Sequence, residues 1–372
     1  MKLIAPADAL RPAIEACAEI ADKTGKRPVY AATRIDCDGS AVKFSAMNGT
    51  ESLQLNVSDR IDPTSVGSVF LPSANLARIV KDAKKDTICL QWNGKSLHAT
   101  LDYGTSRLKL PVEPPENLPP IVSFNPAKPF FTLTASALTS LFKRTTIAVQ
   151  TDFTNRSLHG VCIRTDGATL KMASTDGRRF ALVTATVENP DDAAFDTLAP
   201  PPGPKLLARV AGAGEDEVKV QATPSLLIVN GPSGQMSWRL ISGKFPDYEG
   251  HVPLTAPFTM TLNRKDLLET LERHQLIKSV SSIKHRLTFT AGNLEMFSSA
   301  GVDGETTVNL ALPWVWDDFV IHLDPGLVTA GLAAMSSEEI TFGVDTPKTP
   351  VVFREIGKPF DCLYMVVPMS EQ

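Results

Sequence analysis

The sequence has few cysteines and spaces them widely. The five are Cys17, Cys37, Cys89, Cys162 and Cys362, and none lies within five residues of another. This spacing excludes the paired cysteines of zinc ribbons, and an odd, scattered set is typical of a reducing cytoplasm. The 372 residues also contain no run of roughly 18 to 20 uncharged apolar residues, so we expect no membrane span. The first residues lead into a charged helical pattern and predict no signal peptide.

Enzyme motifs are absent as well. The sequence contains no GxxxxGK[ST], HExxH or GxSxG, and no GxGxxG after a predicted strand. The six histidines are isolated from one another, so we predict no catalytic residue, no metal site and no cofactor. Asp36 and Asp38 flank Cys37, but a solvated turn is a better interpretation of this cluster than a metal site. For Trp314 and Trp316, packing is favoured over base stacking.

What the sequence does contain is repetition. Three segments have apolar residues at intervals of three and four, which is typical of a helix with one buried face: Leu10, Ile14, Cys17 and Ala21; Leu138, Leu141, Phe142 and Thr145; Leu267, Leu268, Leu271 and Leu276. Each is followed by segments of period two, which predict half-buried antiparallel strands, near 53–57, 170–173 and 308–312. A second helix is predicted in each third, around 76–80, 206–210 and 327–332.

Turns and prolines divide the repeats. Asp38-Gly39 and Asn48-Gly49 are hairpin signals ten residues apart, and the pair recurs 128 residues later as Asp166-Gly167 and Asp176-Gly177. Proline-rich stretches at 111–129 and 246–257 have the composition of linkers. We therefore predict an α+β protein of three similar domains, 1–125, 126–254 and 255–372, each with two helices packed on antiparallel sheet.

Charge is distributed unevenly over these elements. The net charge is −4, so the chain is not a simple polycation. The six predicted helical segments nevertheless sum to +7 and the remainder to −11. If the helices share a face, that face attracts a polyanion without sequence preference. The alternative is that the lysines and arginines only solvate helix surfaces.

Three blocks of sequence resemble the beta subunits of bacterial DNA polymerase III, the replicative sliding clamps. They are 158–161 (LHGV) with 173–181 (ASTDGRRFA), 243–248 (GKFPDY) and 364–369 (YMVVPM), and they match family patterns in the same order. The resemblance runs end to end. It implies a ring of two subunits, joined head to tail around duplex DNA, with helices lining the hole and sheets outside. Such a ring tethers a polymerase and has no catalysis of its own.

The resemblance also implies a groove that holds short peptides of partner proteins. Its residues map to Leu158, Thr175, Gly177, Arg178, Arg179, Phe180, Pro246, Met365, Val366, Val367, Pro368 and Met369. The chain departs from the family where Arg178 replaces a histidine, at Glu249, Gly250 and His251, and in the last three residues. No groove residue is assigned in the loop around 281–283. These departures leave the peptide preference open.

DNA contacts are predicted with two kinds of support. Arg27 stands where the family has an Arg-Pro that touches DNA, and Gln150 lies near another family contact. The others follow from charge and helix position only: Lys81, Lys84, Lys85, Lys143, Arg144, Lys205 and Arg209. By resemblance, the ring contact joins 76–80 and 103–110 of one subunit to residues around Leu276, Ile277 and 298–306 of the other.

The implied partners are double-stranded DNA, the polymerase III alpha subunit, the clamp loader, repair polymerases, ligase, mismatch-repair proteins and a second copy of the chain. The implied location is the cytoplasm, at the nucleoid. Three alternatives stay open: a diverged clamp paralogue with specialised partners, a DNA-processing enzyme on the same scaffold, and a monomeric β-rich interaction scaffold.

Overall fold

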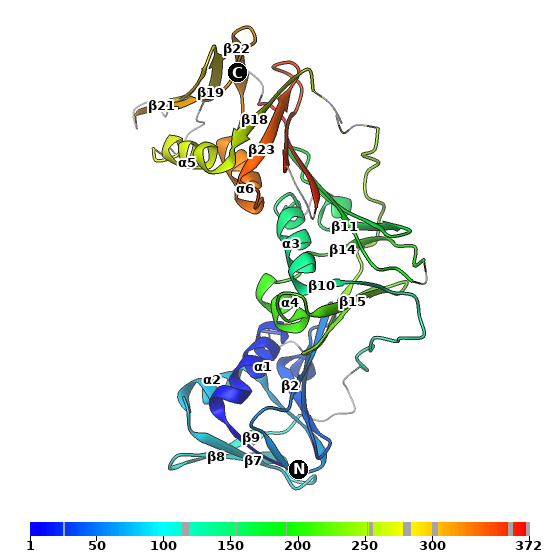
Figure 1. Cartoon of the computed structure of the whole chain (residues 1–372). Coiled ribbons are helices and arrows are strands. Elements are labelled where there is room, and N and C mark those ends of the chain that lie inside the picture. The colour runs from blue at the N-terminus through cyan, green and yellow to red at the C-terminus, as the bar shows by residue number, and fades with distance from the viewer. Residues whose placement is uncertain are drawn as a thin grey trace. The chain divides into compact units, whose positions relative to one another are not determined.

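The structure is a computed structural model, and it describes residues 1–24, 27–113, 119–152, 155–190, 192–250, 252, 256–277, 284–299, 304–355 and 360–369. Within these ranges the chain forms six α-helices and four sheets in which the described strand pairs are antiparallel, which confirms the α+β class (Figure 1). The chain folds into two compact units, Met1–Thr139 with Pro202–Leu240 and Ser140–Pro201 with Ile241–Gln372.

The first unit contains a five-stranded and an eight-stranded sheet. The smaller sheet has the order β5 (Asp62–Ser65), β1 (Lys2–Pro6), β7 (Thr87–Gln91), β8 (His98–Tyr103) and β9 (Ser106–Pro111). The larger has the order β10 (Phe131–Thr134), β15 (Glu217–Ala222), β16 (Leu226–Gly231), β17 (Gly234–Arg239), β4 (Glu51–Val57), β3 (Val42–Met47), β2 (Ala32–Cys37) and β6 (Gly67–Pro72).

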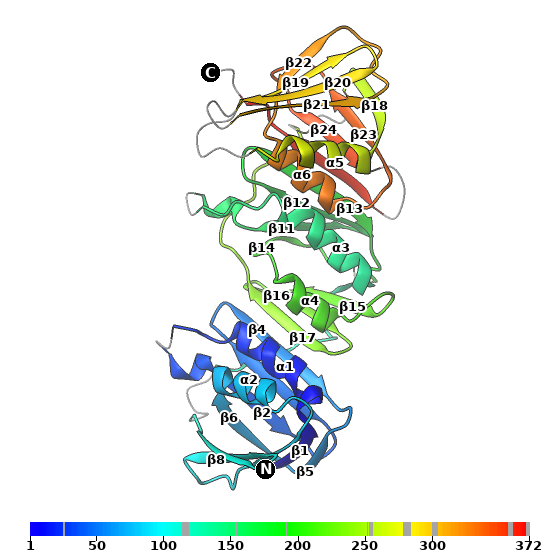
Figure 2. The same ribbon diagram turned by 90° about the vertical axis from the view of Figure 1, so that its left-hand side faces the viewer.

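Helices cover these sheets with their apolar faces. Helix α1 (Ala7–Ile20) packs against α2 (Ser73–Asp82) and strands β3 and β4, and Figure 2 shows the two helices side by side. The predicted face of α1 is confirmed, because Leu10, Ile14 and Cys17 are all buried. Helix α4 (Pro204–Ala211) packs on β16 and β17, and a short 3-10 turn, η1 (Pro28–Ala31), precedes β2.

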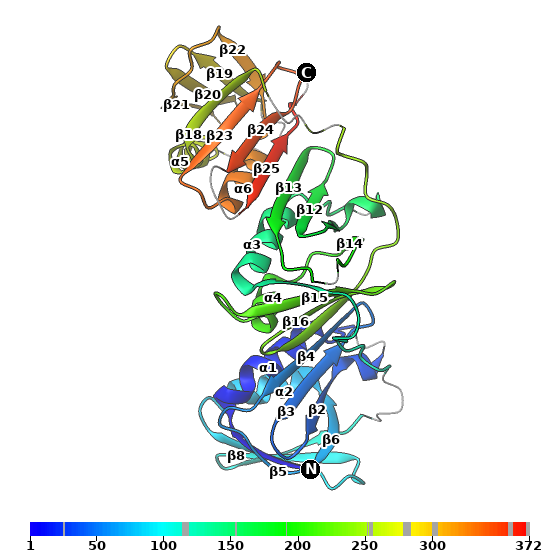
Figure 3. The ribbon, with the colours of Figure 1, turned by 45° about the vertical axis from the view of Figure 1, so that its right-hand side comes forward.

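The second unit also has two sheets. The eight-stranded sheet has the order β14 (Asp196–Ala199), β11 (Val161–Asp166), β12 (Thr169–Thr175), β13 (Arg179–Thr186), β25 (Asp361–Val366), β24 (Val351–Glu355), β23 (Glu339–Val344) and β18 (Phe258–Asn263), and Figure 3 shows β18, β23, β24 and β25 in sequence. The four-stranded sheet has the order β21 (Glu305–Ala311), β20 (Asn293–Ser299), β19 (Lys284–Thr290) and β22 (Phe319–His322). Its helices are α5 (Arg264–His274), α6 (Pro325–Ala334) and the second half of α3 (Ala135–Thr146), with a 3-10 turn, η3 (Arg156–Leu158).

Each eight-stranded sheet joins strands from two successive thirds of the sequence. In the first unit the junction is the pairing of β17 with β4, with Met236 opposite Leu53. In the second unit it is the pairing of β13 with β25, with Leu182 opposite Leu363. The middle third therefore contributes four strands to each of the two large sheets.

Several local predictions can be compared with these elements. All four Asx-Gly turns connect paired strands, and their glycines have φ between 54° and 97°. Trp314 is a core residue, as predicted, and its indole N–H donates to the Asp317 carbonyl oxygen at 2.9 Å. The prediction for Leu276 was wrong: helix α5 ends at His274, and Leu276 lies beyond it with 78% of its surface exposed.

Candidate functional site

The loop between β12 and β13 is a tight turn organised by one carboxylate. The Asp176 side chain accepts the backbone N–H groups of Arg178 at 2.9 Å and Arg179 at 3.1 Å, and it also accepts the Arg179 Nε–H at 2.9 Å. Gly177 completes the turn at φ 86°, a conformation that favours glycine. The Arg178 side chain is left 60% exposed at the tip.

The C-terminal tail lies directly against this turn. Strand β25 pairs with β13 so that Val366 is opposite Arg179 and Met365 is opposite Phe180. Beyond the strand, the Val367 N–H donates to the Arg178 carbonyl oxygen at 2.8 Å. Sequence blocks that are almost 190 residues apart are thus brought together, as the resemblance implied for 178–180 and 365–367.

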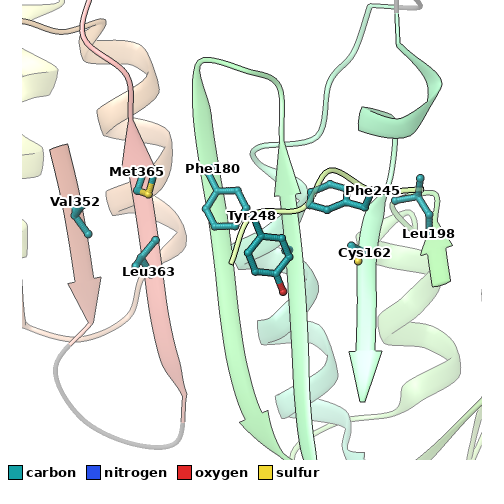
Figure 4. Packing of buried hydrophobic residues seen from close by; sticks show 9 residues of the cluster. Cys162, Phe180, Leu198, Phe245, Tyr248, Val352, Leu363 and Met365 are labelled. Carbon is teal, nitrogen blue, oxygen red and sulfur yellow. The ribbon is translucent and has the colours of Figure 1, made fainter. Parts of the chain in front are cut away.

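A buried apolar cluster lies beside the turn and the tail. Strand register places alternate residues of β11, β12, β13, β25 and β24 on one face of the sheet. The segment 245–248 covers this face, with the Tyr248 ring centroid 5.2 Å from that of Phe180 and 6.1 Å from that of Phe245 (Figure 4). We call this group the strap cluster: Cys162, Ala173, Phe180, Leu198, Phe245, Tyr248, Val352, Leu363 and Met365.

The predicted groove residues differ in how much surface they offer. Phe180 and Met365 belong to the strap cluster, and Val366 is completely buried. Gly177, Arg178, Pro246 and Val367 are exposed, and the rest are half-buried: Leu158, Thr175, Arg179, Pro368 and Met369. The free chain therefore presents polar and small groups around an apolar base.

The tail is also fixed to helix α6. Burial raises the pKa of Tyr364 to about 12, so its hydroxyl keeps its proton at neutral pH, and it donates to the Leu327 carbonyl oxygen at 2.8 Å. Gly331 lets the helix approach, because a Cβ there would lie 2.2 Å from Cε1 of the Tyr364 ring. This close contact holds α6 against β25, which pairs with β13 on one side and β24 on the other.

Sequence reasoning missed Asp324, which lies next to the predicted groove residues. Its Oδ2 is 2.7 Å from Nη2 of Arg178, and its Oδ1 accepts the N–H of Gly326 at 2.9 Å at the start of α6. The Asp-Pro-Gly sequence is a helix-start signal and predicts the cap, but nothing local links it to Arg178. Phe245 and Tyr248 of the strap cluster were also missed, although they stand in a block that was singled out.

One predicted DNA contact was wrong. Arg144 is buried, with 4% of its side chain exposed, and its Nε lies 2.6 Å from Oε2 of Glu355, whose side chain is 3% exposed. Its guanidinium also donates to the hydroxyls of Ser140 and Ser336, both at 2.6 Å. Arg144 follows Lys143 on an amphipathic helix, but it lies on the packed face, so it cannot reach a phosphate.

The other predicted DNA residues are at the surface. Arg27, Lys81, Lys84, Lys85, Lys143 and Lys205 are exposed, whereas Gln150 and Arg209 are half-buried. Arg27 lies over the Tyr30 ring at 5.6 Å. Gln150 donates to the Asp152 carboxylate at 2.5 Å.

The described residues contain no group of three or more histidine, cysteine or acidic side chains that could hold a metal ion. Asp36 instead accepts a hydrogen bond from Arg34, and Asp38 caps its own turn through the N–H groups of Ser40 and Ala41. In the same ranges, no helix is long and apolar enough to cross a membrane.

Solved structures establish the class of fold. A crystal structure of the DNA polymerase III subunit beta from Pseudomonas aeruginosa matches with a TM-score of 0.89 at 21% identity, and a DNA polymerase sliding clamp from Bacillus subtilis matches with 0.92 at 18% identity. Both likenesses cover 100% of each chain. The chain therefore has the clamp fold.

Sequence comparisons give the family. The N-terminal domain model of the DNA polymerase III beta subunit matches residues 1–122, and the central domain model matches residues 132–247. The "Beta sliding clamp" of Chlamydia muridarum is 23% identical over 373 aligned residues, with 99% of each chain covered. The "Beta sliding clamp" of Pseudomonas aeruginosa is 21% identical, with 97% of this chain and 98% of the relative covered. The chain belongs to the DNA polymerase III beta subunit family.

Proposed function

We propose that this chain is a DNA sliding clamp, a processivity factor that encircles duplex DNA and tethers the replicative polymerase. In this role it is a non-catalytic accessory subunit. The observation that carries the proposal is the match of two successive beta-subunit domain models in their family order, within a full-length likeness to sliding clamps. We further propose three domains, 1–125, 126–254 and 255–372, because each third contains two helices and its own set of strands.

Two copies close the ring in this proposal. Strand β9 is an edge of the five-stranded sheet, and β21 is an edge of the four-stranded sheet. Unpaired edges are a liability, and pairing β9 of one subunit with β21 of the other removes both. Leu276 is 78% exposed, so its apolar side chain is available to that interface. Leu76 and Val80 of α2 are buried, so they are core residues of their own subunit.

The proposed DNA contacts are weak and sequence-independent. They are the surface residues Arg27, Lys81, Lys84, Lys85, Lys143, Lys205, Arg209 and Gln150. Long, flexible cations suit sliding, since they contact phosphates without reading bases. Replacing Lys84 and Lys85 by glutamine should reduce the salt dependence of DNA binding, and the slope should fall by about one for each phosphate that the variant no longer neutralises.

The proposed partner groove combines the turn, the tail and the strap cluster. Its residues are Leu158, Thr175, Gly177, Arg178, Arg179, Phe180, Pro246, Met365, Val366, Val367, Pro368 and Met369. Methionine and valine give adaptable apolar contacts that suit several partner peptides. We propose that the polymerase III alpha subunit, the clamp loader, repair polymerases, ligase and mismatch-repair proteins bind here, at the nucleoid in the cytoplasm.

Fluorescence polarisation tests the groove. The probe is a labelled peptide from the clamp-binding segment of the organism's own replicative polymerase. The comparison chain ends at Val367, because Met365 and Val366 belong to the central strand β25 and their removal would unfold the second unit. Saturable binding that is lost in the shortened chain supports the proposal. Equal binding by both chains would reject Pro368 and Met369 as groove residues, and no binding by the folded full chain would favour the diverged paralogue.

Sedimentation tests the ring independently of the peptide. The expected species at micromolar concentration is a dimer of the 40.1 kDa chain. A mass near that of one chain would instead support the monomeric scaffold. Nuclease or transferase activity that requires a metal would support the DNA-processing alternative.

A further inference from the structure

The C-terminal tail is held by two segments that are distant in sequence. The Val367 N–H donates to the carbonyl oxygen of Arg178, in the β12–β13 turn, at 2.8 Å. The Met369 N–H donates to the carbonyl oxygen of His322, at the end of β22, also at 2.8 Å. The Arg178 side chain then joins these two segments, with its Nη2 2.7 Å from Oδ2 of Asp324.

Asp324 is the fixed partner of this ion pair. Its other oxygen, Oδ1, caps α6 by accepting the N–H groups of Gly326 at 2.9 Å and Leu327 at 3.4 Å. Leu327 in turn accepts the Tyr364 hydroxyl, so the cap is tied to β25. The carboxylate therefore stays in place whether or not Arg178 is bound to it.

Arg178 is the movable partner. Its side chain is 60% exposed, and the neighbouring Gly177 faces open space, with nothing within 4 Å of where a Cβ would lie. An exposed ion pair of this kind is weak and exchangeable, because water and other carboxylates compete for the guanidinium. Releasing Arg178 leaves the Asp176-centred turn intact, since its hydrogen bonds are to backbone and to Arg179.

The turn carries no free positive charge while the pair is closed. Arg179 is bound to Asp176 at 2.9 Å, and Arg178 is bound to Asp324. Arg178 is bound to Asp324 through Nη2, so a carboxylate of an incoming peptide competes with Asp324 for the charge of the guanidinium. Complete exchange also separates the turn from the segment beside Met369.

We infer that the Arg178–Asp324 ion pair is a latch that closes the turn over the C-terminal tail and competes with acidic partner peptides for Arg178. The inference rests on the proposed function, because the competing peptide is the one that the groove binds. An acidic peptide opens the latch by exchange, whereas a neutral peptide leaves it closed. Asp324 thereby sets how strongly the groove prefers an acidic residue.

Asp324→Asn isolates the charge from the fold. Asparagine caps helices as well as aspartate, so its side-chain oxygen keeps the bonds to Gly326 and Leu327 while the ion pair is removed. Arg178→Gln removes the other charge. Glu269→Gln is the matched control, because it neutralises an exposed ion pair with Arg273 (3.3 Å, side chains 62% and 65% exposed) on α5, away from the tail.

The probes are two labelled peptides from the polymerase segment that differ only in Asp or Asn beside their apolar residues. Asp324→Asn should raise affinity for the Asp peptide about two- to fivefold, the range expected for removing one exposed competitor, and leave the Asn peptide unchanged. Arg178→Gln should bind both peptides equally. An equal gain for both peptides in Asp324→Asn, or a preserved preference in Arg178→Gln, would overturn the inference.

Hydrogen exchange measured by mass spectrometry tests whether the latch holds the tail when no peptide is present. Both latch variants should speed amide exchange in residues 367–369, and Glu269→Gln should not. Unchanged exchange together with normal peptide binding rejects the latch and keeps the groove. If the wild-type chain binds neither peptide but the variants still speed exchange in the tail, the groove is rejected. The Arg178–Asp324 pair would then be a contact that stabilises only the fold.

Discussion

Replacing Arg144 by methionine tests whether its ion pair with Glu355 holds the second unit together. The pair connects the second half of α3 to β24, and the bonds from Ser336 and Ser337 connect it to the end of α6. Glu355 Oε1 accepts the N–H groups of Ser336 at 2.6 Å and Ser337 at 3.0 Å. Methionine keeps the unbranched apolar stem and removes the charge together with the hydrogen bonds of the guanidinium, so the change measures their combined contribution.

The expected loss follows from the burial of both partners. Removing one member of a buried, hydrogen-bonded pair costs about 3–5 kcal/mol, because the other charge stays out of water without its partner. The two serine N–H groups still serve Glu355, which places the expected loss of unfolding free energy near the lower end, about 3 kcal/mol. The double variant Arg144→Met with Glu355→Met should lose less unfolding free energy than the two single variants added together. The difference should be about 2 kcal/mol or more, because the double variant leaves no buried charge without a partner.

The pair also predicts acid sensitivity. Burial alone raises the pKa of Glu355, but the hydrogen bonds from Arg144 and the two serine N–H groups outweigh it and lower the pKa to about 2, from 4.5. A lowered carboxyl pKa gives stability that is complete above about pH 4.5 and lost as the pH falls toward 2. In Arg144→Met the pKa of Glu355 should rise because the Arg144 hydrogen bond and charge are gone, so the stability lost between about pH 4.5 and 2 should become smaller.

Urea unfolding followed by hydrogen exchange and mass spectrometry measures these effects, since exchange assigns each transition to one of the two units. The matched control is Arg273→Met, which breaks the exposed pair with Glu269 and should cost less than about 1 kcal/mol. A loss for Arg144→Met no larger than that of the control would refute the reasoning. So would strictly additive single and double variants.

Three further predictions concern other residues. Burial and the neighbouring His285 lower the pKa of His274 to about 4; Nδ1 of His285 lies 3.2 Å from Nε2 of His274. The free energy of unfolding should therefore fall by about 2 kcal/mol between pH 7.5 and 5, as measured by urea titration. In His274→Phe it should change less with pH over the same range. Gly331→Ala should lower the melting temperature by several degrees, because the new Cβ would overlap the Tyr364 ring; an unchanged value would show that α6 can shift. Cys89 is the one cysteine that is not buried, so a thiol reagent should label about one group per native chain and all five after unfolding.

Much of the fold could be predicted from the sequence because its signals are local. The buried faces of α1 and α5 follow from apolar spacing, and the hairpins follow from Asx-Gly pairs that need positive φ. The end of α5 could not be read in the same way. Leu276 is apolar but lies five residues after Leu271, and the helix stops at His274. Apolar character alone does not distinguish a residue of the buried face from one exposed beyond the helix end.

The candidate site was harder to predict, because it depends on pairings between distant segments. The turn at 176–178 and the tail were singled out by resemblance, but the Arg178–Asp324 contact spans 146 residues and has no local signature. Arg144 shows the opposite failure. Charge on a helix predicts exposure, and only the position of Glu355 on β24 reveals that this arginine is buried.

The shared eight-stranded sheets have a consequence for cutting the chain into pieces. A fragment that ends near residue 125 contains β4 without β17, and one that ends near 254 contains β13 without β25. Each would present a long strand edge, rich in Leu53 and Leu55 or in Phe180 and Leu182, with unpaired N–H and C=O groups. Such edges pair with any strand available, so isolated thirds of this chain should aggregate or exchange strands even when every residue of the third is present.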